Sequence, residues 1–398
     1  MGVFPLSLEN YYVSETYGFL LENCLEYLPE YFDEWNNLAK AMPELVSNKE
    51  LRNAVHKLEV LDHTRLSGHH EYRLAHLQLS IISAGYIWQE GDSGAATILP
   101  KCLSVPWCGV SSYLGIQPVI SHPSLVLANW KLLEDQSTMK CLYKLPGEDE
   151  AEWFITVTAQ VELAFASGLK NLMQMLYHAQ CENLQELENC LIKTVETLER
   201  MKKAMSTMHE RLSPETFYDC LRPFLTGWGG ESSPLPDGIV YEGISDQPRK
   251  MTGGSAAQSS TVQCIDSVLG IKHEKDIREF LLNMRSYMPL PHRQFIETIE
   301  QHSQVKQVVE SSSSTSLKSA YDECLKSVID FRSYHIQIVS KYIILMANRD
   351  TRNKDYEALA TKGTGGSSLL PFLKSLRTTT SACLSTNKSD NTTKESTS

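Results

Sequence analysis

The sequence predicts an all-α protein, and three observations support this. Apolar residues recur at helical spacing over long stretches, no stretch shows convincing strand alternation, and hydrophobic residues make up 42% of the 398-residue chain, which is enough for a sizeable core. We expect a smaller, mostly helical N-terminal domain over residues 1–145 and a larger helical domain over residues 146–378. The Ser/Thr/Asn/Lys-rich tail over residues 379–398 should be disordered.

In the N-terminal part, the clearest helix is expected near residues 70–88, with Leu74, Leu77 and Ile81 facing inward. The segment "LPGEDEAE" (145–152) is typical of a linker. Beyond it the helical patterns lengthen. One apolar face begins at Phe154, and another runs through residues 184–208.

The stretch "SPET" (213–216) predicts a helix start, because Ser213 suits the N-cap and Pro214 the first turn. This helix should kink near Pro223 and end at Gly227. A long irregular segment (229–262) follows. Further helices are expected near residues 262–270, 274–286, 291–303 and 317–347, and a short one after the loop 362–368.

The overall composition excludes several classes of protein. The net charge is −11 and no block of Lys and Arg is dense enough to follow a phosphate backbone, so we expect no nucleic-acid partner. No apolar run approaches the roughly 20 residues that span a bilayer, so no membrane partner is expected either. The start of the sequence lacks the pattern of a signal peptide, and the ten cysteines show no C-x-x-C spacing. We therefore expect a cytoplasmic protein with free thiols. We also expect a monomer.

One histidine lies where a helix should be buried. In "DFRSYHIQIVSKYI" (330–343), His335 falls on the apolar face between Phe331 and Ile338, and Arg332 lies one turn earlier. Two interpretations stay open: a core histidine bonded to a carbonyl with Arg332 reaching solvent, or a ligand of a metal or haem with Arg332 on an anionic group. A single helical histidine on a wide apolar face suits haem better than zinc.

Several motifs occur in an order that is familiar from one family. They are "VLANW" (126–130), "FYDCLRPFLTGW" (217–228), "GGSAAQSS" (253–260), "RSYMPLPHRQF" (285–295), "RSYHIQIVSKYI" (332–343) and "KGTGG" (362–366). Together they resemble the indoleamine 2,3-dioxygenases over essentially the whole chain except the tail. The resemblance implies one haem b per chain, O₂ as cosubstrate, an electron donor that keeps the iron ferrous, and L-tryptophan or related indoleamines as substrates. The implied product is N-formyl-L-kynurenine, formed by cleaving the indole C2–C3 bond in the first step of the kynurenine pathway.

The resemblance also implies roles for individual residues. His335 would bind the haem iron, Arg332 would pair with a haem propionate and be steadied by Asp266, and Arg222 would bind the substrate carboxylate. The other implied site residues are the aromatic walls Phe154, Phe217 and Tyr218, the loop Gly254, Ser255 and Ala256 over the haem face, and Thr364 on a loop that closes on substrate. Without the resemblance, these aromatic residues and glycines would be ordinary core and turn residues.

Two positions nearest the expected reaction depart from the well-known mammalian members, which have Tyr and Ser there. This chain has His122 and Thr158. The pair resembles the second, low-affinity vertebrate paralogue or an ancestral form. The resemblance implies that Thr158 adds a methyl group to a closely packed pocket, where overpacking costs roughly 1–3 kcal/mol. We therefore expect a low affinity for tryptophan.

Two alternatives to an enzyme remain. The pattern "IVYEGI" (239–244) matches a short phosphotyrosine inhibitory motif, so the chain would be a weakly catalytic or non-catalytic haem-binding signalling protein acting through Tyr241. A haem-containing sensor without turnover is the other alternative. Product formation from L-tryptophan distinguishes both from a dioxygenase.

Overall fold

The computed structural model describes residues 6–135, 138–230, 233–350 and 369–384, and these residues form a predominantly helical protein, as the sequence predicts. The α-helices are α1 (Asp33–Ser47), α2 (Leu51–Val55), α3 (Gly68–Trp88), α4 (Lys101–Leu114), α5 (Glu148–Gln180), α6 (Leu184–Ser206), α7 (Arg222–Leu225), α8 (Ser260–Leu269), α9 (Lys275–Arg285), α10 (Leu290–His302), α11 (Val305–Ser311), α12 (Thr315–Val339), α13 (Leu345–Ala347) and α15 (Leu369–Ser381). The strands are two residues long: β1 (Ile98–Leu99), β2 (Lys131–Leu132), β3 (Met139–Lys140) and β4 (Val240–Tyr241).

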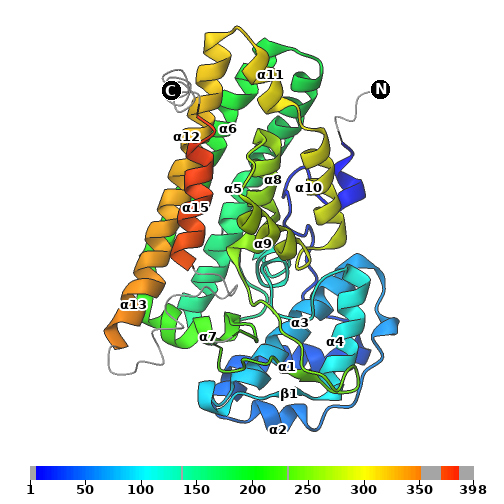
Figure 1. Cartoon of the computed structure of the whole chain (residues 1–398). Helices are drawn as coiled ribbons and strands as arrows, with labels where there is room; N and C mark the ends of the chain where they lie inside the picture. Colours follow the sequence, from blue (N-terminus) through cyan, green and yellow to red (C-terminus); the bar gives the residue numbers. More distant parts are fainter. Residues whose placement is uncertain (1–5, 136–137, 231–232, 351–368, 385–398) are drawn as a thin grey trace.

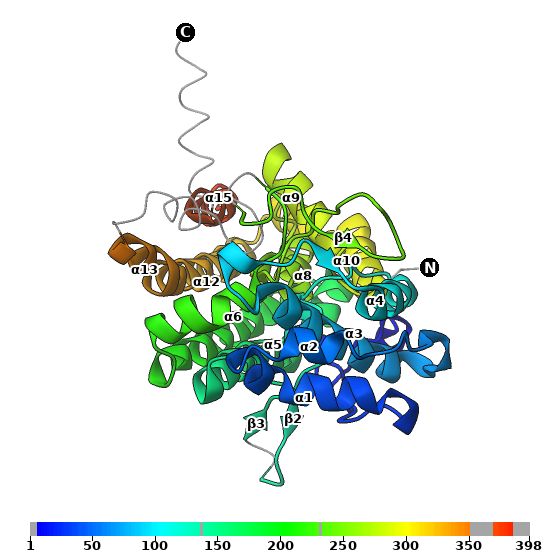
Figure 2. The same cartoon turned by 90° about the horizontal axis from the view of Figure 1, so that it is seen from below.

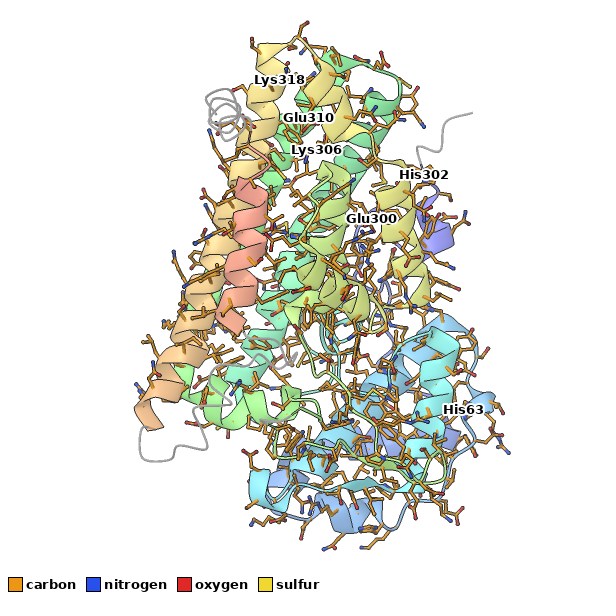
Figure 3. All side chains as sticks on the ribbon, in the orientation of Figure 1. His63, Glu300, His302, Lys306, Glu310 and Lys318 are labelled. Carbon is orange, nitrogen blue, oxygen red and sulfur yellow. The ribbon has the colours of Figure 1, made fainter. Side chains whose placement is uncertain are left out.

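The helices form two groups. The long helices α5, α6 and α12 run side by side, with α15 against α12, while α1, α3 and α4 gather with β1 at the other end of the molecule (Figure 1). The view from below shows α1, α2 and α3 in front of the long helices (Figure 2). Side chains fill the space between elements, and charged ones such as Glu300, Lys306 and Glu310 gather on α10 and α11 (Figure 3).

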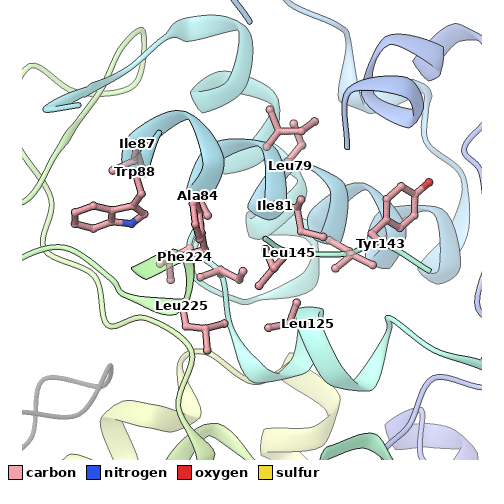
Figure 4. Close-up of a cluster of buried hydrophobic side chains, with 14 of the residues drawn as sticks. Leu79, Ile81, Ala84, Ile87, Trp88, Leu125, Tyr143, Leu145, Phe224 and Leu225 are labelled. Atoms are coloured by element: carbon pink, nitrogen blue, oxygen red, sulfur yellow. The ribbon is translucent and has the colours of Figure 1, made fainter. Parts of the chain in front are cut away.

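Buried apolar side chains form two clusters. The first is built around α3, whose Ile81, Ala84 and Ile87 pack near Leu145 and Phe224 (Figure 4). The second lies among the long helices and also receives side chains from the first 20 residues of the chain. Residues from both sides of position 145 therefore contribute to each cluster, and the domain boundary at 145/146 stays a prediction.

The chain returns to the N-terminal group after α7. Strand β4 pairs in parallel with β1, with Val240 opposite Ile98 and Tyr241 opposite Leu99. The irregular segment expected over residues 229–262 is thus anchored at its middle rather than free. This pairing was not predicted, because two-residue strands leave no alternation in the sequence.

Most predicted helices are confirmed, with informative differences at their ends. The helix expected over residues 70–88 is α3, and that expected over 317–347 is α12 continued by a π-helical turn (Ser340–Ile344) and α13. Helix α11 was missed because its seven residues are too few to show a period. The helix from Ser213 is a π-helical turn (Thr216–Leu221) followed by α7, which ends at Leu225, two residues before the expected Gly227.

The C-terminal part is ordered beyond the predicted boundary at residue 378. Helix α15 continues to Ser381, and Thr380 within it is fully buried. Residues 385–398 lie outside the described residues. Within the described part of the chain, no helix is both long and apolar enough to cross a membrane. All ten cysteines are free thiols, as expected.

Candidate functional site

His335, on the inner side of α12, lines two adjoining cavities. The larger has a volume of about 160 Å³ and the smaller of about 60 Å³. Both are bordered by His335, Ala256 and Ala257, and by Phe372 and Leu373 of α15. Helix α12 therefore forms one wall of a divided slot, and the segment before α8 together with α15 forms others.

The larger cavity has an aromatic wall. The ring centroids of Phe154 and Phe217 lie 5.1 Å apart, and those of Phe217 and Tyr342 lie 5.8 Å apart. Tyr342 is fixed at its far end because its hydroxyl donates a hydrogen bond to the Leu212 carbonyl at 2.9 Å. Three elements, α5 and the π-helical turns Thr216–Leu221 and Ser340–Ile344, thus bring aromatic rings to one place. Such π-helical turns often occur at functional sites.

The imidazole of His335 makes no hydrogen bond to any described residue. Burial lowers the pKa of His335 to about 4, so the ring is neutral at physiological pH and has a lone pair available as a ligand. Among the described residues, none supplies the carbonyl partner that the interpretation of His335 as a core histidine requires.

Arg332 does not reach solvent, because it is buried at the edge of the smaller cavity. Its Nη2 lies 2.6 and 2.7 Å from the two carboxylate oxygens of Asp266, and its Nη1 donates to the Leu376 carbonyl at 3.0 Å and to the Thr380 hydroxyl. Nε2 of His273 donates to the same carboxylate at 2.8 Å. Burial alone would raise the pKa of Asp266, but Arg332 and His273 hold it below its ordinary value.

The loop residues Gly254, Ser255 and Ala256 all line the larger cavity. The loop reaches this position because two backbones touch: a Cβ on Gly253 would lie 2.2 Å from the Leu225 carbonyl oxygen and 2.3 Å from the Gly227 nitrogen. The Gly254 amide donates to the same carbonyl at 2.9 Å. Only glycine permits this approach, so the loop is held against the end of α7.

The structure does not bring His122 or Thr158 to the wall of either cavity. The Nε2 of His122 lies 2.9 Å from Oε1 of the buried Glu162. The Thr158 hydroxyl donates to the Phe154 carbonyl at 2.8 Å. Phe154 lines the larger cavity, so Thr158 lies one helical turn from the aromatic wall.

Arg222 and Tyr218 lie together, also outside the residues that line the cavities. Arg222 is buried, with its guanidinium carbon 5.0 Å from the centre of the Tyr218 ring. Burial lowers the pKa of Arg222, while Tyr218 and Asp92 oppose this shift. The role of Arg222 toward a substrate carboxylate stays a prediction. Thr364 lies outside the described residues.

Some site residues were missed by sequence reasoning. Phe372 and Leu373 line both cavities, but the sequence predicts only that they lie in a short helix. Glu162 bonds to His122 and to the loop before α8. A signal for Glu162 existed, because it lies four residues after Thr158 at the edge of an otherwise apolar face.

The phosphotyrosine alternative meets a structural obstacle. Tyr241 is fully buried in β4, and its hydroxyl donates a hydrogen bond of 2.6 Å to the Pro118 carbonyl. A kinase could reach this hydroxyl only after β4 separated from β1. The folded protein therefore does not present Tyr241 as a signalling site.

The donor set at His335 suits haem. Within the described ranges, no group of three or more His, Cys, Asp or Glu side chains could hold a metal ion by itself. Haem needs one protein ligand and a flat apolar slot, and His335 with the aromatic and aliphatic lining fits these needs. Arg332 borders the smaller cavity but is already paired with Asp266, so its role toward a haem propionate stays a prediction. The larger cavity is smaller than the roughly 300 Å³ of a typical small-molecule site.

Fold and site together define a predominantly helical protein with a half-buried histidine in an apolar cavity, which suits a flat, apolar, iron-bearing cofactor. The chain belongs to the indoleamine 2,3-dioxygenase family of haem-dependent enzymes, whose family model matches residues 7–383. It is 38% identical over 384 residues to human indoleamine 2,3-dioxygenase 2, covering 94% of each chain. It is 36% identical to rat indoleamine 2,3-dioxygenase 1, covering 95% of each. It is also 41% identical over 373 residues to a protein named myoglobin from Haliotis madaka, covering 94% of this chain and 97% of that one.

Proposed function

We propose that this protein is a haem dioxygenase that cleaves the indole C2–C3 bond of L-tryptophan to give N-formyl-L-kynurenine. One observation carries the proposal: His335, neutral and without a hydrogen bond among the described residues, lines an apolar cavity walled by Phe154 and Phe217. His335, the proposed ligand for iron, and Phe154 and Phe217, the proposed surface for an indole ring, thus border the same space.

The chain's own residues would act by holding and orienting the reactants. His335 and Arg332 would hold a haem, which when bound supplies the oxygen chemistry. The rings of Phe154 and Phe217 would stack against the indole, since aromatic pairs prefer offset or tilted contacts at about 4.5–7 Å. Ser255 and the backbone of the loop add polar groups at the edge of this wall. The apolar lining would exclude water from the reacting atoms.

We also propose that the affinity for L-tryptophan is low. Thr158 stands one turn from Phe154 on the same helix, and its hydroxyl bond to the Phe154 carbonyl restricts its rotamer. Its methyl group then has few alternative positions. A bulkier residue behind the aromatic wall leaves less freedom for Phe154 to adjust to the indole.

A second candidate function is oxygen binding without turnover. It is favoured by the relatives named myoglobin from Haliotis madaka and Haliotis diversicolor, at 41% and 39% identity, which are similar to this chain at least as strongly as the dioxygenases named above. An oxygen carrier would need the haem ligand but no aromatic wall that binds a substrate. The aromatic wall of Phe154 and Phe217 favours the dioxygenase.

The experiment uses the full chain loaded with haem, reduced, and supplied with L-tryptophan and labelled O₂. A dioxygenase would form N-formylkynurenine that contains both labelled oxygen atoms. Reversible O₂ binding without any product would instead support the carrier. His335→Ala serves as the control that removes the haem ligand while keeping the aromatic wall.

A further inference from the structure

Glu162 is a buried carboxylate that lines neither cavity and has no part in the proposed function described above. Glu162 of α5 is only 3% exposed, and it accepts hydrogen bonds from three side chains. Its Oε1 lies 2.9 Å from Nε2 of His122 and accepts from the Ser259 hydroxyl at 2.7 Å, while its Oε2 accepts from the Thr261 hydroxyl. A buried acid in an apolar helix face is costly unless it is bonded in this way.

The partners of Glu162 belong to two segments that meet at the site. Ser259 and Thr261 flank the start of α8, which lies beside α5 (Figure 1). They directly follow the cavity-lining residues 254–257. His122 comes from the segment between α4 and β2. One carboxylate therefore joins α5, the loop before α8 and the His122 segment.

Gln258 also links the loop before α8 to the His122 segment. Its Oε1 accepts from the backbone amides of His122 at 3.0 Å and Ser255 at 3.3 Å, and its Nε2 donates to the Gly253 carbonyl at 2.8 Å. The loop 253–261 is thus bonded to Glu162 at its end and to Gln258 within it. If either bond network were lost, residues 254–257 could shift relative to Phe154, which lies two turns before Glu162 on α5.

These hydrogen bonds determine the ionisation state of Glu162 and which nitrogen of His122 carries a proton. Burial alone raises the pKa of the Glu162 carboxyl, but hydrogen bonds from His122, Thr261 and Ser259 outweigh it and hold the pKa below its ordinary value. The carboxylate is therefore ionised and can only accept. It follows that Nε2 of His122 carries the proton, so the ring is fixed as a donor to Glu162.

We propose that Glu162 is a positioning residue that holds His122 and the loop 253–261 in place and thereby sets the affinity of the site for its indole substrate. The inference rests on the proposed function and deepens it. It gives His122 a role through Glu162 rather than through direct contact with substrate. Specificity here would depend on residues that touch neither reactant.

The test compares Glu162→Leu and Glu162→Gln with a matched control, Glu152→Gln. Glu152 is a buried carboxylate on the same helix, but it pairs with Lys144 at 2.8 Å and lines neither cavity. Hydrogen exchange of the haem-free full chain reports on the loop directly. We expect the amides of residues 254–261 to exchange roughly tenfold faster in Glu162→Leu, with no change in Glu152→Gln.

Binding of L-tryptophan to the haem-loaded chain gives the second readout, followed by the haem absorbance. In Glu162→Leu, the dissociation constant for L-tryptophan should rise roughly tenfold, because a small displacement of a positioning loop is costly. The affinity for haem should stay as in the wild type. Glu162→Gln should recover most of the loss, since its carboxamide can still accept from His122 and Ser259 and donate to Thr261.

Several results would overturn the inference. Unchanged loop exchange and unchanged L-tryptophan binding in Glu162→Leu would remove Glu162 from this role. So would a Glu162→Gln variant that loses helix content and haem together, because the residue would then support the whole fold. If Glu162→Leu does not fold, Thr261→Val, which removes one donor to Glu162 and keeps the branched side-chain shape, takes its place in both measurements. Absence of turnover in the wild type would contradict the proposed function, yet the exchange data would still decide the role of Glu162.

Discussion

Nη2 of Arg332 lies 2.6 and 2.7 Å from the two carboxylate oxygens of Asp266, and both side chains are buried at the edge of the cavity that His335 lines. Removing one partner of a buried ion pair leaves the other charge uncompensated. We expect Asp266→Asn to lower the free energy of unfolding by about 3–5 kcal/mol, measured by urea denaturation of the haem-free chain.

A matched exposed pair provides the control for this prediction. Lys131 and Glu26 lie 2.8 Å apart on the surface, and Glu26→Gln should cost less than about 1 kcal/mol. Equal losses in the two variants would mean that burial does not strengthen the Arg332–Asp266 pair.

Arg222→Leu should impair the use of L-tryptophan. A buried guanidinium that binds a carboxylate contributes roughly 1.5–3 kcal/mol, so kcat/KM for L-tryptophan should fall roughly ten- to a hundredfold. Tryptamine has no carboxylate and should respond little. Steady-state kinetics with both substrates measure the difference, and similar losses for the two would remove Arg222 from substrate binding.

Thr158→Ser should lower the Michaelis constant for L-tryptophan by a few-fold, because it removes one methyl group behind Phe154. Thr156→Ser is the matched control: Thr156 is a buried threonine on the same helix whose hydroxyl donates to the Glu152 carbonyl at 3.0 Å. The effects of His122→Tyr and Thr158→Ser on the Michaelis constant need not add, since His122→Tyr also changes the bond to Glu162. An unchanged constant in Thr158→Ser would show that affinity is set elsewhere.

Stability should fall at mildly acidic pH because several histidines are buried. Burial lowers the pKa of His292 to about 3, whereas in the unfolded chain a histidine titrates near 6.5. As the pH falls below 6.5, the unfolded state takes up the proton first, so the free energy of unfolding decreases. His292 alone should account for about 2 kcal/mol between pH 8 and pH 5.

Urea denaturation at pH 8 and at pH 5 tests this prediction. Between these pH values, the free energy of unfolding should fall less in His292→Gln than in the wild type. His302→Gln is the control, because His302 is exposed on the same helix and stays in solvent in both states. A pH dependence of His292→Gln equal to that of the wild type would contradict a neutral, buried His292.

Helix positions were largely predictable, whereas contacts between distant segments were not. The apolar spacing around Leu74, Leu77 and Ile81 indicated α3, because a buried helix face leaves a regular period in the sequence. The contact of Gly253 with Leu225 leaves no such trace, since it joins two loops by their backbones. The pairing of β1 with β4 was hidden for the same reason.

The candidate site was predicted in part. His335 stood out because an imidazole on an apolar helix face is unusual, and Arg332 followed from its position one turn earlier. The family resemblance then pointed to Phe154, Phe217 and the loop at Ser255, which the structure brings to one cavity. The bond between His122 and Glu162 could not be foreseen, because it joins residues 40 positions apart through side-chain geometry alone.

A haem titration of the full chain, followed by the Soret band, tests whether His335 is the haem ligand. His335→Ala should bind haem far more weakly than the wild type while its helix content persists, and added imidazole should restore part of the spectrum. His292→Gln, which changes a buried histidine away from both cavities, should bind haem like the wild type. A His335→Ala variant with the wild-type affinity and spectrum would contradict the assignment of His335 as the haem ligand.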